Sequence, residues 1–442
     1  MHGKPATPAQ RDTIFALASA PGRAGLAVVR VSGPQAAEAI RHLTGHEPPS
    51  ERKAVLRSLF DKSIDERIDT ALVLFFAAPH SYTGENVSEF QVHGGRAVTA
   101  ALLSALSHFA GFRPAEAGEF TRRAVENGRL DLTQAEAIAD LVSAETDAQR
   151  LLALGQYDGR LAELYEGWRS RLIRAAAWIE AAIDFADEDI PADAAARSRT
   201  SLGAILHEIQ THLNDGRRGE ILREGLHVAV IGPPNAGKSS LVNALAQRDV
   251  AIVSEIPGTT RDVIEVRLDL GGYPVILADT AGLREPGDSI EQEGVRRALA
   301  RAESADLRLL VLDGASGAPT MPGDLPADIV VRNKADIALD KTAPGLWVSA
   351  KTGEGLSELA DALAERAAKL LAVGEAPVLT RARHRHALEE AARALVAALK
   401  TDEPELAAEH IRMALRSIGR ITGRVDLDEL LDVVFRDFCI GK

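Results

Sequence analysis

The sequence predicts a multidomain protein of mixed α+β and α/β class, with an N-terminal α/β domain, a central helical domain and an α/β domain inserted into the helical one. Three observations predict it. Short apolar strands alternate with helices over roughly the first 115 residues, helical periodicity dominates the flanks of the later chain, and an α/β pattern begins abruptly at Leu226. The 442 residues provide enough chain for roughly two or three separate cores.

The N-terminal region carries strand and helix patterns in alternation. Its strand candidates are AVVRVSG at 27–33, ALVLFF at 71–76 and VSEFQV at 87–92. AVTAALLSALSHF, at 97–109, has the apolar spacing of a helix. We expect these elements to form one α/β domain over residues 1–117.

Helical periodicity defines two separate segments of a central domain. In SLGAILHEIQTHL the apolar residues share one helix face: Leu202, Ile205, Leu206, Ile209 and Leu213. The α/β block ends with the helix GLSELADALAERAAKLLA, after which helical spacing returns. Because domain termini usually lie close together, we expect segments 118–217 and 373–442 to pack together around a domain inserted at 218–372.

Composition restricts the class of protein. Hydrophobic residues make up 46% of the chain and charged residues 26%, which is ordinary for a globular protein. The net charge of −13 argues against non-specific coating of nucleic acid. A single cysteine allows no internal disulfide, and no apolar run approaches the roughly 20 residues that span a bilayer. We read no signal peptide and expect a cytoplasmic protein without a membrane segment.

Two basic clusters stand out against this acidic background. One is RARHRH at 381–386, and the other is four arginines spaced by four: Arg412, Arg416, Arg420 and Arg424. On a helix that spacing places them along one side. A solvated face partly paired with Glu409 is favoured over a phosphate-binding stripe, and glycines at 419 and 423 further disfavour a continuous stripe.

The strongest motif is GPPNAGKS at Gly232–Ser239, which fits G-x-x-x-x-G-K-[ST] and which we call the P-loop. It follows the apolar strand HVAVI and precedes the helix SSLVNALA, as a phosphate-binding loop requires. In such a loop Lys238 reaches the β- and γ-phosphates, and the hydroxyl of Ser239 ligates Mg²⁺. We therefore predict a nucleotide site here.

Three further motifs in fixed order identify the base. DTAG at 279–282 follows the apolar strand PVILA, NKAD at 333–336 ends the strand DIVVR, and SAK at 349–351 follows LWV. A carboxylate at Asp336 can accept hydrogen bonds from the ring N–H and the exocyclic amine of guanine, a donor pair that adenine lacks at that edge. The order predicts a Ras-like P-loop GTPase domain, and makes a P-loop kinase a poor alternative.

The predicted nucleotide site draws on five groups of residues. Thr259 and Thr260 lie between the P-loop and DTAG, where a loop can bring a second Mg²⁺-ligating hydroxyl. The full predicted GTP-binding set is Asn235, Ala236, Gly237, Lys238, Ser239, Ser240, Ser254, Glu255, Ile256, Pro257, Gly258, Thr259, Thr260, Asp279, Thr280, Ala281, Gly282, Asn333, Lys334, Ala335, Asp336, Ser349, Ala350 and Lys351. The hairpin DLGGYPV predicts one antiparallel edge on an otherwise parallel sheet.

The sequence leaves the hydrolytic residue open. Many GTPases orient the attacking water with a glutamine directly after D-x-x-G, but this chain has Leu283 there. A side chain elsewhere must do this work. The acids of LREPGDSIEQEG are the candidates: Glu285, Glu291 and Glu293.

The motifs together resemble the MnmE (TrmE) family of tRNA-modification GTPases over nearly the whole chain. PGRAG, SYTGENVSEFQVHGG, AGEFTRRAVENGRLDLTQAEAIADLV, GPPNAGKSSLVNALA, IPGTTRDV, DTAGLRE, RNKAD and FCIGK occur in the order of the family's blocks. The resemblance implies a folate-binding, dimerising N-terminal domain and a central helical domain into which the GTPase is inserted.

The resemblance also implies roles for individual residues. Asn235 matches an asparagine that helps bind K⁺, with Ser254, Ile256 and Thr259 completing the shell. Ser239 and Thr260 would hold Mg²⁺. Glu291 matches the glutamate that orients water in place of the missing glutamine, which makes it the implied catalytic residue.

A tetrahydrofolate derivative, in its 5-formyl or 5,10-methylene form, is the implied ligand of the N-terminal domain. Arg30, Glu89 and Arg129 match the contacting positions, and Lys442 in the tail is a fourth. At 129 the family often has lysine, so this arginine keeps the charge and changes the hydrogen-bond geometry.

The implied reaction belongs to a complex. A homodimer would join a FAD- and NADH-using, MnmG/GidA-like partner in a heterotetramer or larger assembly. The complex would add a carboxymethylaminomethyl or aminomethyl group to C5 of the wobble uridine, U34, of certain tRNAs, with the folate supplying one carbon. The alternative is a GTP-switched factor for RNA or ribosome assembly without modification chemistry, against which stand the N-terminal blocks and the FCIGK tail.

The tail Cys439-Ile440-Gly441-Lys442 contains the only cysteine of the chain. It occupies the place of a prenylation box, but Gly441 is not aliphatic and lysine is not a usual last residue. The residues before it have the spacing of an apolar helix face: Leu427, Leu430, Leu431, Val434 and Phe438. We expect this helix to pack and so to hold the tail in a definite place. A reactive thiol and a merely positioned one both remain open for Cys439.

Overall fold

The computed structural model describes residues 12–184, 194–248, 250–252, 265–279, 303–316, 327–372, 374, 377–425, 431, 434–435, 438–439 and 441. The chain divides into two compact units by internal contacts. Unit 1 comprises residues 1–139 and 416–442, and unit 2 comprises residues 140–415. Each unit is described by itself.

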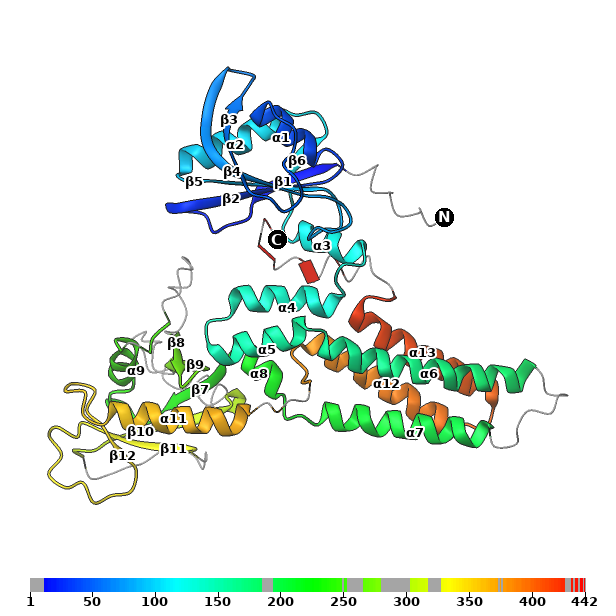
Figure 1. Cartoon of the computed structure of the whole chain (residues 1–442). Coiled ribbons are helices and arrows are strands. Elements are labelled where there is room, and N and C mark those ends of the chain that lie inside the picture. The colour runs from blue at the N-terminus through cyan, green and yellow to red at the C-terminus, as the bar shows by residue number, and fades with distance from the viewer. Residues whose placement is uncertain are drawn as a thin grey trace, which may run out of the picture. The chain divides into compact units, whose positions relative to one another are not determined.

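Unit 1 is built on a six-stranded sheet in the order β3-β4-β5-β2-β1-β6 (Figure 1). Its pairs are antiparallel except β1 with β6, which run parallel. The strands are β1 Thr13–Leu17, β2 Ala24–Ser32, β3 Val55–Asp61, β4 Glu66–Phe76, β5 Val87–Gly94 and β6 Phe112–Pro114. The three strands predicted from the sequence, at 27–33, 71–76 and 87–92, are confirmed as β2, β4 and β5.

Two helices bury one face of this sheet. They are α1 (Ala36–Thr44) and α2 (Arg96–Ser107), the second being the predicted helix at 97–109. Alternate strand residues such as Val29, Val73 and Phe90 are fully buried in their shared core. Because side chains alternate across a strand, the neighbouring residues Arg30, Leu72 and Glu89 belong to the opposite face.

The C-terminal residues complete unit 1. Helices α3 (Glu119–Glu126) and α4 (Leu132–Ser143) follow the sheet. Leu431, Phe435 and Phe438 form one apolar cluster with Leu132 and Ala135 of α4. This buried cluster fixes the end of the chain within the unit that contains its beginning.

Unit 2 contains a set of long helices. They are α5 (Asp147–Tyr157), α6 (Arg160–Asp184), α7 (Ala194–Leu213), α8 (Arg218–Glu224), α12 (Ala382–Lys400) and α13 (Pro404–Thr422), whose last residues belong to unit 1. Helix α6 packs against α7, and α7 against α12, although the whole inserted segment separates α7 from α12 in the chain. Helices before and after residues 218–372 therefore pack against each other. Helix α13 runs through Gly419 and ends before Gly423, so Gly419 does not break it.

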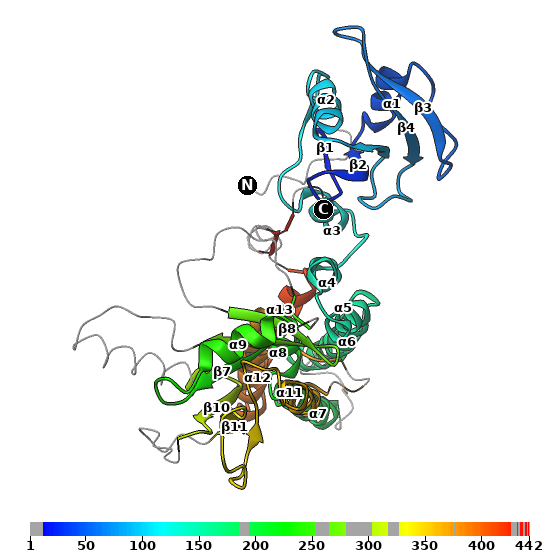
Figure 2. The same ribbon diagram turned by 90° about the vertical axis from the view of Figure 1, so that its left-hand side faces the viewer.

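The second sheet lies within unit 2 and has the order β12-β11-β10-β7-β9-β8. The strands are β7 Leu226–Ile231, β8 Glu265–Leu270, β9 Tyr273–Asp279, β10 Leu307–Asp313, β11 Ile329–Asn333 and β12 Leu346–Trp347. All pairs are parallel except β8 with β9, which confirms the predicted antiparallel edge. Helices α9 (Lys238–Ala246) and α11 (Leu356–Leu371) pack against it (Figure 2).

Parallel strands explain where the site lies. The carboxyl ends of β7, β9, β10 and β11 meet at one edge of the sheet, and ligands of such folds bind outside that edge. The predicted motifs follow these strands directly. Within the described ranges, no helix combines the length and apolarity needed to cross a bilayer.

Candidate functional site

The P-loop joins the end of β7 to the start of α9. Three of its residues have left-handed backbone: Gly232 (φ 146°), Asn235 (φ 60°) and Gly237 (φ 88°). A Cβ on Gly232 would lie 2.1 Å from the carbonyl oxygen of Val311, so only glycine fits there. The loop therefore turns back tightly and leads into the N-terminus of α9, where unpaired N–H groups favour an anion.

Lys238 lies inside this loop. Its ammonium donates hydrogen bonds to the carbonyl oxygens of Gly232 at 2.9 Å and Pro233 at 3.0 Å, and the residue is 9% exposed. The cation is thus held at the concave side of the loop. Ser239 follows it in the first turn of α9, while Ser240 and Asn235 are exposed.

Asn333 connects three of the predicted motifs. Its side-chain nitrogen donates to the carbonyl oxygens of Ala236 at 2.9 Å and Gly237 at 3.4 Å. Its side-chain oxygen accepts from the N–H groups of Lys334 at 2.8 Å and Ala350 at 3.1 Å. This buried amide therefore ties NKAD to the P-loop, 97 residues before it in the chain, and to SAK, 17 residues after it.

Asp336 presents an exposed carboxylate beside these loops. The hydroxyl of Ser349 donates to Asp336 Oδ1 at 2.7 Å and accepts from the N–H of Thr352 at 3.1 Å. This hydrogen bond from Ser349 lowers the pKa of Asp336 below its ordinary value. An oriented, ionised carboxylate at this place can accept a pair of N–H donors from a base edge.

Asp313 is a site residue that the sequence analysis missed. It ends β10, and its carboxylate accepts from Lys334 Nζ at 2.6 Å. Burial raises the pKa of Asp313, but the Lys334 ammonium and the N–H of Ala315 outweigh it, so the pKa lies below the ordinary value. Lys334 has left-handed backbone (φ 66°), and this ion pair fixes its stem. The sequence signal that could have identified Asp313 is an acidic residue directly at the end of a buried strand.

Part of the predicted nucleotide set lies outside the described residues. Strand β9 ends at Asp279, which places the start of DTAG beside the end of β7, its parallel neighbour. The side chain of Asp279 is not described. The other predicted residues outside the described ranges are Ser254, Glu255, Ile256, Pro257, Gly258, Thr259, Thr260, Thr280, Ala281, Gly282 and Glu291.

In unit 1, Arg30 and Glu89 are directly opposite each other on β2 and β5. Arg30 Nε lies 2.9 Å from Glu89 Oε1, and their side chains are 20% and 17% exposed. The Arg30 guanidinium also lies 5.1 Å from the ring centre of Tyr82 and 5.7 Å from that of Phe120. Two residues that the sequence predicted as a pair of ligand contacts thus form one partly buried ion pair bordered by aromatic rings.

Arg129 contacts the loop that carries Tyr82. Its side-chain stem approaches Gly84, where a Cβ would lie 3.1 Å from Arg129 Cγ. The guanidinium itself is on an exposed residue. Tyr82 and Phe120 were not predicted. Both are far from Arg30 in the chain, and no sequence pattern indicates that their rings contact its guanidinium.

The tail packs within unit 1. The carbonyl oxygen of Cys439 accepts a hydrogen bond from the Gly118 N–H at 3.3 Å, and Cys439 is exposed. Gly441 (φ 103°) lies so close to β1 that a Cβ would be 2.1 Å from the carbonyl oxygen of Leu17. Cys439 and Gly441 therefore contact described residues of unit 1, and close backbone approach requires glycine at 441. Leu427 and Leu430 of the predicted helix lie outside the described residues. Lys442 lies outside the described residues.

Three arginines of the two basic clusters are paired with acids within unit 2. Arg385 donates to Asp215 at 2.8 Å and Glu220 at 2.9 Å, and Arg381 lies 2.7 Å from Asp140. Arg412 is 45% exposed and pairs with Glu409, as expected, and with Glu180. The pairing of Arg412 favours a solvated, paired face over a phosphate-binding stripe.

Two family descriptions match the chain. The MnmE helical domain matches residues 132–439, and the N-terminus of the GTP-binding protein TrmE matches residues 13–129. The tRNA modification GTPase MnmE of Parvibaculum lavamentivorans is 55% identical over 437 residues, covering 98% of this chain and 100% of that protein. The proteins of the same name from Rhodospirillum rubrum and Paramagnetospirillum magneticum are also 55% identical, again over 98% of this chain and over 99% and 100% of their own lengths.

Among solved structures, the G domain of the T. maritima FeoB iron transporter covers 32% of this chain and 98% of its own at 29% identity, with a TM-score of 0.24. The full-length relatives decide the family. Because they cover 98% of this chain, their matches run through both units. By these matches, the chain belongs to the MnmE family.

Proposed function

We propose that this protein is a GTPase that acts in tRNA modification. The observation that carries the proposal is the buried Asn333 amide, which joins the P-loop, NKAD and SAK into one guanine-nucleotide site. Relatives named tRNA modification GTPase match at 55% identity over nearly the full length of both chains. The acidic net charge of −13 fits a division of labour in which a partner protein supplies much of the tRNA-binding surface.

The P-loop residues fit the phosphates of GTP. Lys238 would exchange its hydrogen bonds to the carbonyl oxygens of Gly232 and Pro233 for hydrogen bonds to phosphate oxygens. Ser239 would hold Mg²⁺ together with Thr260. Bound Mg²⁺ supplies positive charge against the phosphate oxygens.

The base loops fit guanine. Asp336 would accept the ring N–H and the exocyclic amine, and Ser349 keeps the carboxylate oriented and ionised for both. Lys334, held by Asp313, would cover the base with its stem. Asn333 sets the distance between the base loops and the P-loop, so that one nucleotide fills both.

We assign hydrolysis to K⁺ and Glu291. Asn235, with the backbone region of Ser254, Ile256 and Thr259, would hold K⁺ next to the phosphates, where it supplies charge that an arginine provides in other GTPases. Asn235 is exposed at the P-loop surface with left-handed backbone, which leaves its side chain accessible to an ion. Glu291 would orient the attacking water in place of the glutamine that Leu283 replaces.

One experiment tests both assignments. GTP hydrolysis and GTP affinity are measured in K⁺ and in Na⁺, for the wild type and for Glu291→Ala. We expect wild-type hydrolysis to fall strongly in Na⁺, and the variant to be slow in both salts with GTP affinity nearly intact. Equal wild-type rates in the two salts would rule out the K⁺ site, and a wild-type rate in Glu291→Ala would move the water-orienting role to another residue.

We propose that unit 1 binds a tetrahydrofolate derivative in 5-formyl or 5,10-methylene form. Arg30, Glu89 and Arg129 would contact it, with Lys442 as a fourth contact. The Glu89 carboxylate can accept N–H donors of a pterin ring, and the Tyr82 and Phe120 rings border that position. Exposed Cys439 would lie in the tail that packs against the same unit, and Cys439→Ser with unchanged tRNA modification would exclude it as a nucleophile.

We propose a homodimer that forms over the open face of the unit 1 sheet. Leu56 and Leu72 are directly opposite each other on β3 and β4 and are 65% and 38% exposed, with Phe60 on the same edge strand 38% exposed. Apolar side chains exposed together on one face of a sheet are typical of an interface. Light scattering of the purified chain measures the stoichiometry, and a monomer would contradict the dimer.

The larger assembly follows from the family. We propose that the homodimer binds a FAD- and NADH-using partner in the cytoplasm and that the complex modifies C5 of U34 in tRNA, with an aminomethyl-type product. The proposed functional domains are residues 1–117 for folate and dimerisation, 118–217 and 373–442 for the helical domain, and 218–372 for GTP.

Mass spectrometry of wobble uridines tests this function. We expect the C5 modification to disappear in a strain lacking the gene and to return when the wild-type gene is restored. Lys238→Ala, restored in the same way, is the matched control that removes the phosphate-binding cation, and it should not bring the modification back. Unchanged uridines in the deletion strain would favour a GTP-switched assembly factor.

A further inference from the structure

The loop Ser81–Glu85 connects β4 to β5 and presents two residues toward the predicted ligand contacts. The ring of Tyr82 lies 5.1 Å from the Arg30 guanidinium, and its hydroxyl is 2.7 Å from Thr121 Oγ1 of α3. Gly84, with left-handed backbone (φ 77°), lies against the stem of Arg129. This loop therefore contacts both cations, Arg30 through Tyr82 and Arg129 through Gly84.

Buried polar side chains hold the Ser81–Glu85 loop in place through hydrogen bonds. The Ser32 hydroxyl of β2 lies 2.7 Å from Thr83 Oγ1 and donates to Glu85 Oε2 at 2.8 Å. Asn127, just after α3, donates to the carbonyl oxygen of Thr83 at 2.6 Å. Ser32 and Thr83 are fully buried and Glu85 is 4% exposed, so these hydrogen bonds do not compete with water.

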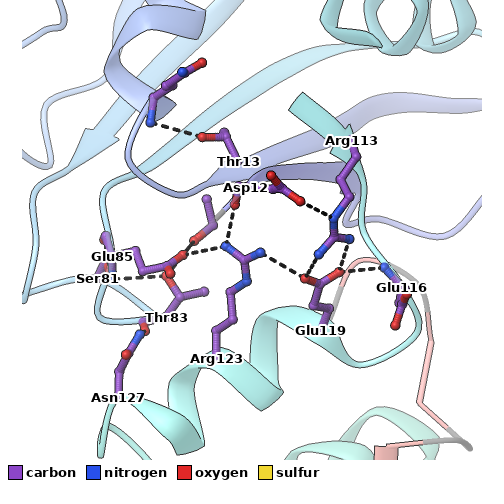
Figure 3. A network of polar contacts seen from close by, with 12 residues as sticks. Asp12, Thr13, Ser81, Thr83, Glu85, Arg113, Glu116, Glu119, Arg123 and Asn127 are labelled. Atoms are coloured by element: carbon purple, nitrogen blue, oxygen red, sulfur yellow. Dashed lines mark hydrogen bonds and ion pairs between the residues drawn. The ribbon is translucent and has the colours of Figure 1, made fainter. Parts of the chain in front are cut away.

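Arg123 of α3 is the centre of this arrangement, as Figure 3 shows. Its guanidinium donates to Glu85 Oε2 at 3.0 Å, to Glu119 Oε1 at 2.9 Å and to the carbonyl oxygen of Asp12 at 3.0 Å. The side chain is 5% exposed. One planar cation thus links the loop, helix α3 and the residue that precedes β1, a task for which lysine lacks the fork geometry.

The outer half of the network ends at the surface. Glu119 also accepts from both terminal nitrogens of Arg113, at 2.6 and 2.8 Å, and from the N–H of Glu116 at 2.9 Å. Burial raises the pKa of Glu119, but the hydrogen bonds from Arg113 and Glu116 and the charge of Arg123 outweigh it, so the pKa is lowered. The Arg113 side chain is 40% exposed and donates to the carboxylates of Glu119 and Asp12, both outside the loop, which makes it a matched control.

We propose that Arg123 is a positioning residue of the folate site: it fixes the Ser81–Glu85 loop and, through Tyr82 and Gly84, the placement of Arg30 and Arg129. The inference rests on the proposed folate function of unit 1. Apolar residues can replace buried ion pairs without loss of stability, so stability alone does not account for two carboxylates and a guanidinium in this place. Placement of a loop that borders the ligand contacts does account for them.

The test measures binding of 5-formyltetrahydrofolate to the full chain by calorimetry. Arg123→Met should raise the Kd about tenfold or more, and Arg123→Lys should recover part of the loss. Arg113→Met should stay within about twofold of wild type, because it loses contacts to the same Glu119 and leaves the loop in place. GTP hydrolysis, a property of unit 2, should be the same in all variants and shows that each is folded there.

A second variant covers the case in which Arg123→Met does not fold. Thr83→Val removes the hydroxyl between Ser32 and the Glu85 N–H and keeps the shape of the side chain, and it should also weaken folate binding. Wild-type protein that binds no folate would overturn the proposed function of unit 1. Wild-type protein that binds, with both Arg123→Met and Thr83→Val equal to it, would overturn the positioning role. If Arg113→Met weakens folate binding as much as Arg123→Met does, the network only stabilises unit 1 in general, and the positioning role of Arg123 is overturned.

Discussion

Gly237→Ala should abolish tight GTP binding, with a loss of affinity of about a hundredfold or more. A Cβ at this position would lie 2.3 Å from the side-chain nitrogen of Asn333. Asn333 cannot move aside cheaply, since it is 2% exposed and its side chain holds hydrogen bonds to the P-loop, NKAD and SAK. The substitution therefore separates the phosphate loop from the base loops.

Two costs are combined at Gly237, and a control separates them. Its φ of 88° is left-handed, which costs an alanine roughly 1 kcal/mol by itself. Gly159 has the same φ of 88°, but nothing lies within 4 Å of a Cβ built there. Gly159→Ala should lose that backbone term alone and bind GTP as the wild type does.

Titration with a fluorescent GTP analogue and measured hydrolysis rates check this prediction. If Gly237→Ala binds GTP within a few-fold of Gly159→Ala, then the Asn333 bridge does not set the distance between the two halves of the site. Asn333 would then contribute to GTP binding only by orienting its neighbours in NKAD.

Acidification should destabilise the helical part of unit 2 through His212. Its ring lies 5.6 Å from that of Trp168 and its Nε2 lies 3.4 Å from the Tyr165 hydroxyl, between helices α6 and α7. Burial is the main cause that lowers the pKa of His212 from 6.5 to about 4; the charges of Arg385 and His384 contribute in the same direction, and the charge of Asp215 opposes them. The folded protein therefore keeps this ring neutral.

The direction of the effect follows from proton uptake. Between pH 6.5 and about 4 the unfolded chain binds a proton at His212 and the folded chain does not, so the free energy of unfolding falls as pH falls through this window. The contribution of the neutral His212 ring to the free energy of unfolding is complete above pH 6.5, and about 3 kcal/mol of it is lost by pH 4. At pH 5 the loss should be about 2 kcal/mol.

Urea unfolding followed by tryptophan fluorescence at pH 7 and pH 5 measures this loss, with Trp168 as the probe next to the titrating ring. His212→Gln is the control, since glutamine can keep a hydrogen bond with Tyr165 but does not titrate. The variant should lack most of the decrease between the two pH values. The same decrease in both proteins would show that other groups are responsible.

The nucleotide loops could be predicted because their physics is local. Lys238 donates to the carbonyl oxygens of Gly232 and Pro233, six and five residues before it. Parallel strands bring the ends of β7, β9, β10 and β11 to one edge in any such sheet. Alternation and helical spacing likewise predicted β2, β4, β5, α2 and α11, whose amphipathic patterns are strong. The Gly-Gly hairpin correctly predicted the antiparallel edge.

Partners far apart in the chain could not be predicted, because no periodicity relates them. Asp313 and Lys334 are 21 residues apart, Arg123 and Glu85 are 38 apart, and Arg123 meets the Asp12 carbonyl across 111 residues. The sequence marked Arg30 and Glu89 through family resemblance, but it did not indicate Tyr82 or Phe120 around them.

The sequence by itself determined some of the strands and helices, the order of the nucleotide motifs and the preference for guanine, since each depends on neighbours along the chain. Only the tertiary structure decided that Asn333 joins three loops, that Arg123 holds the Ser81–Glu85 loop, and that Gly441 lies against Leu17. These contacts form only when packing has removed water from both partners. Their geometry depends on the whole core, and no short segment specifies it.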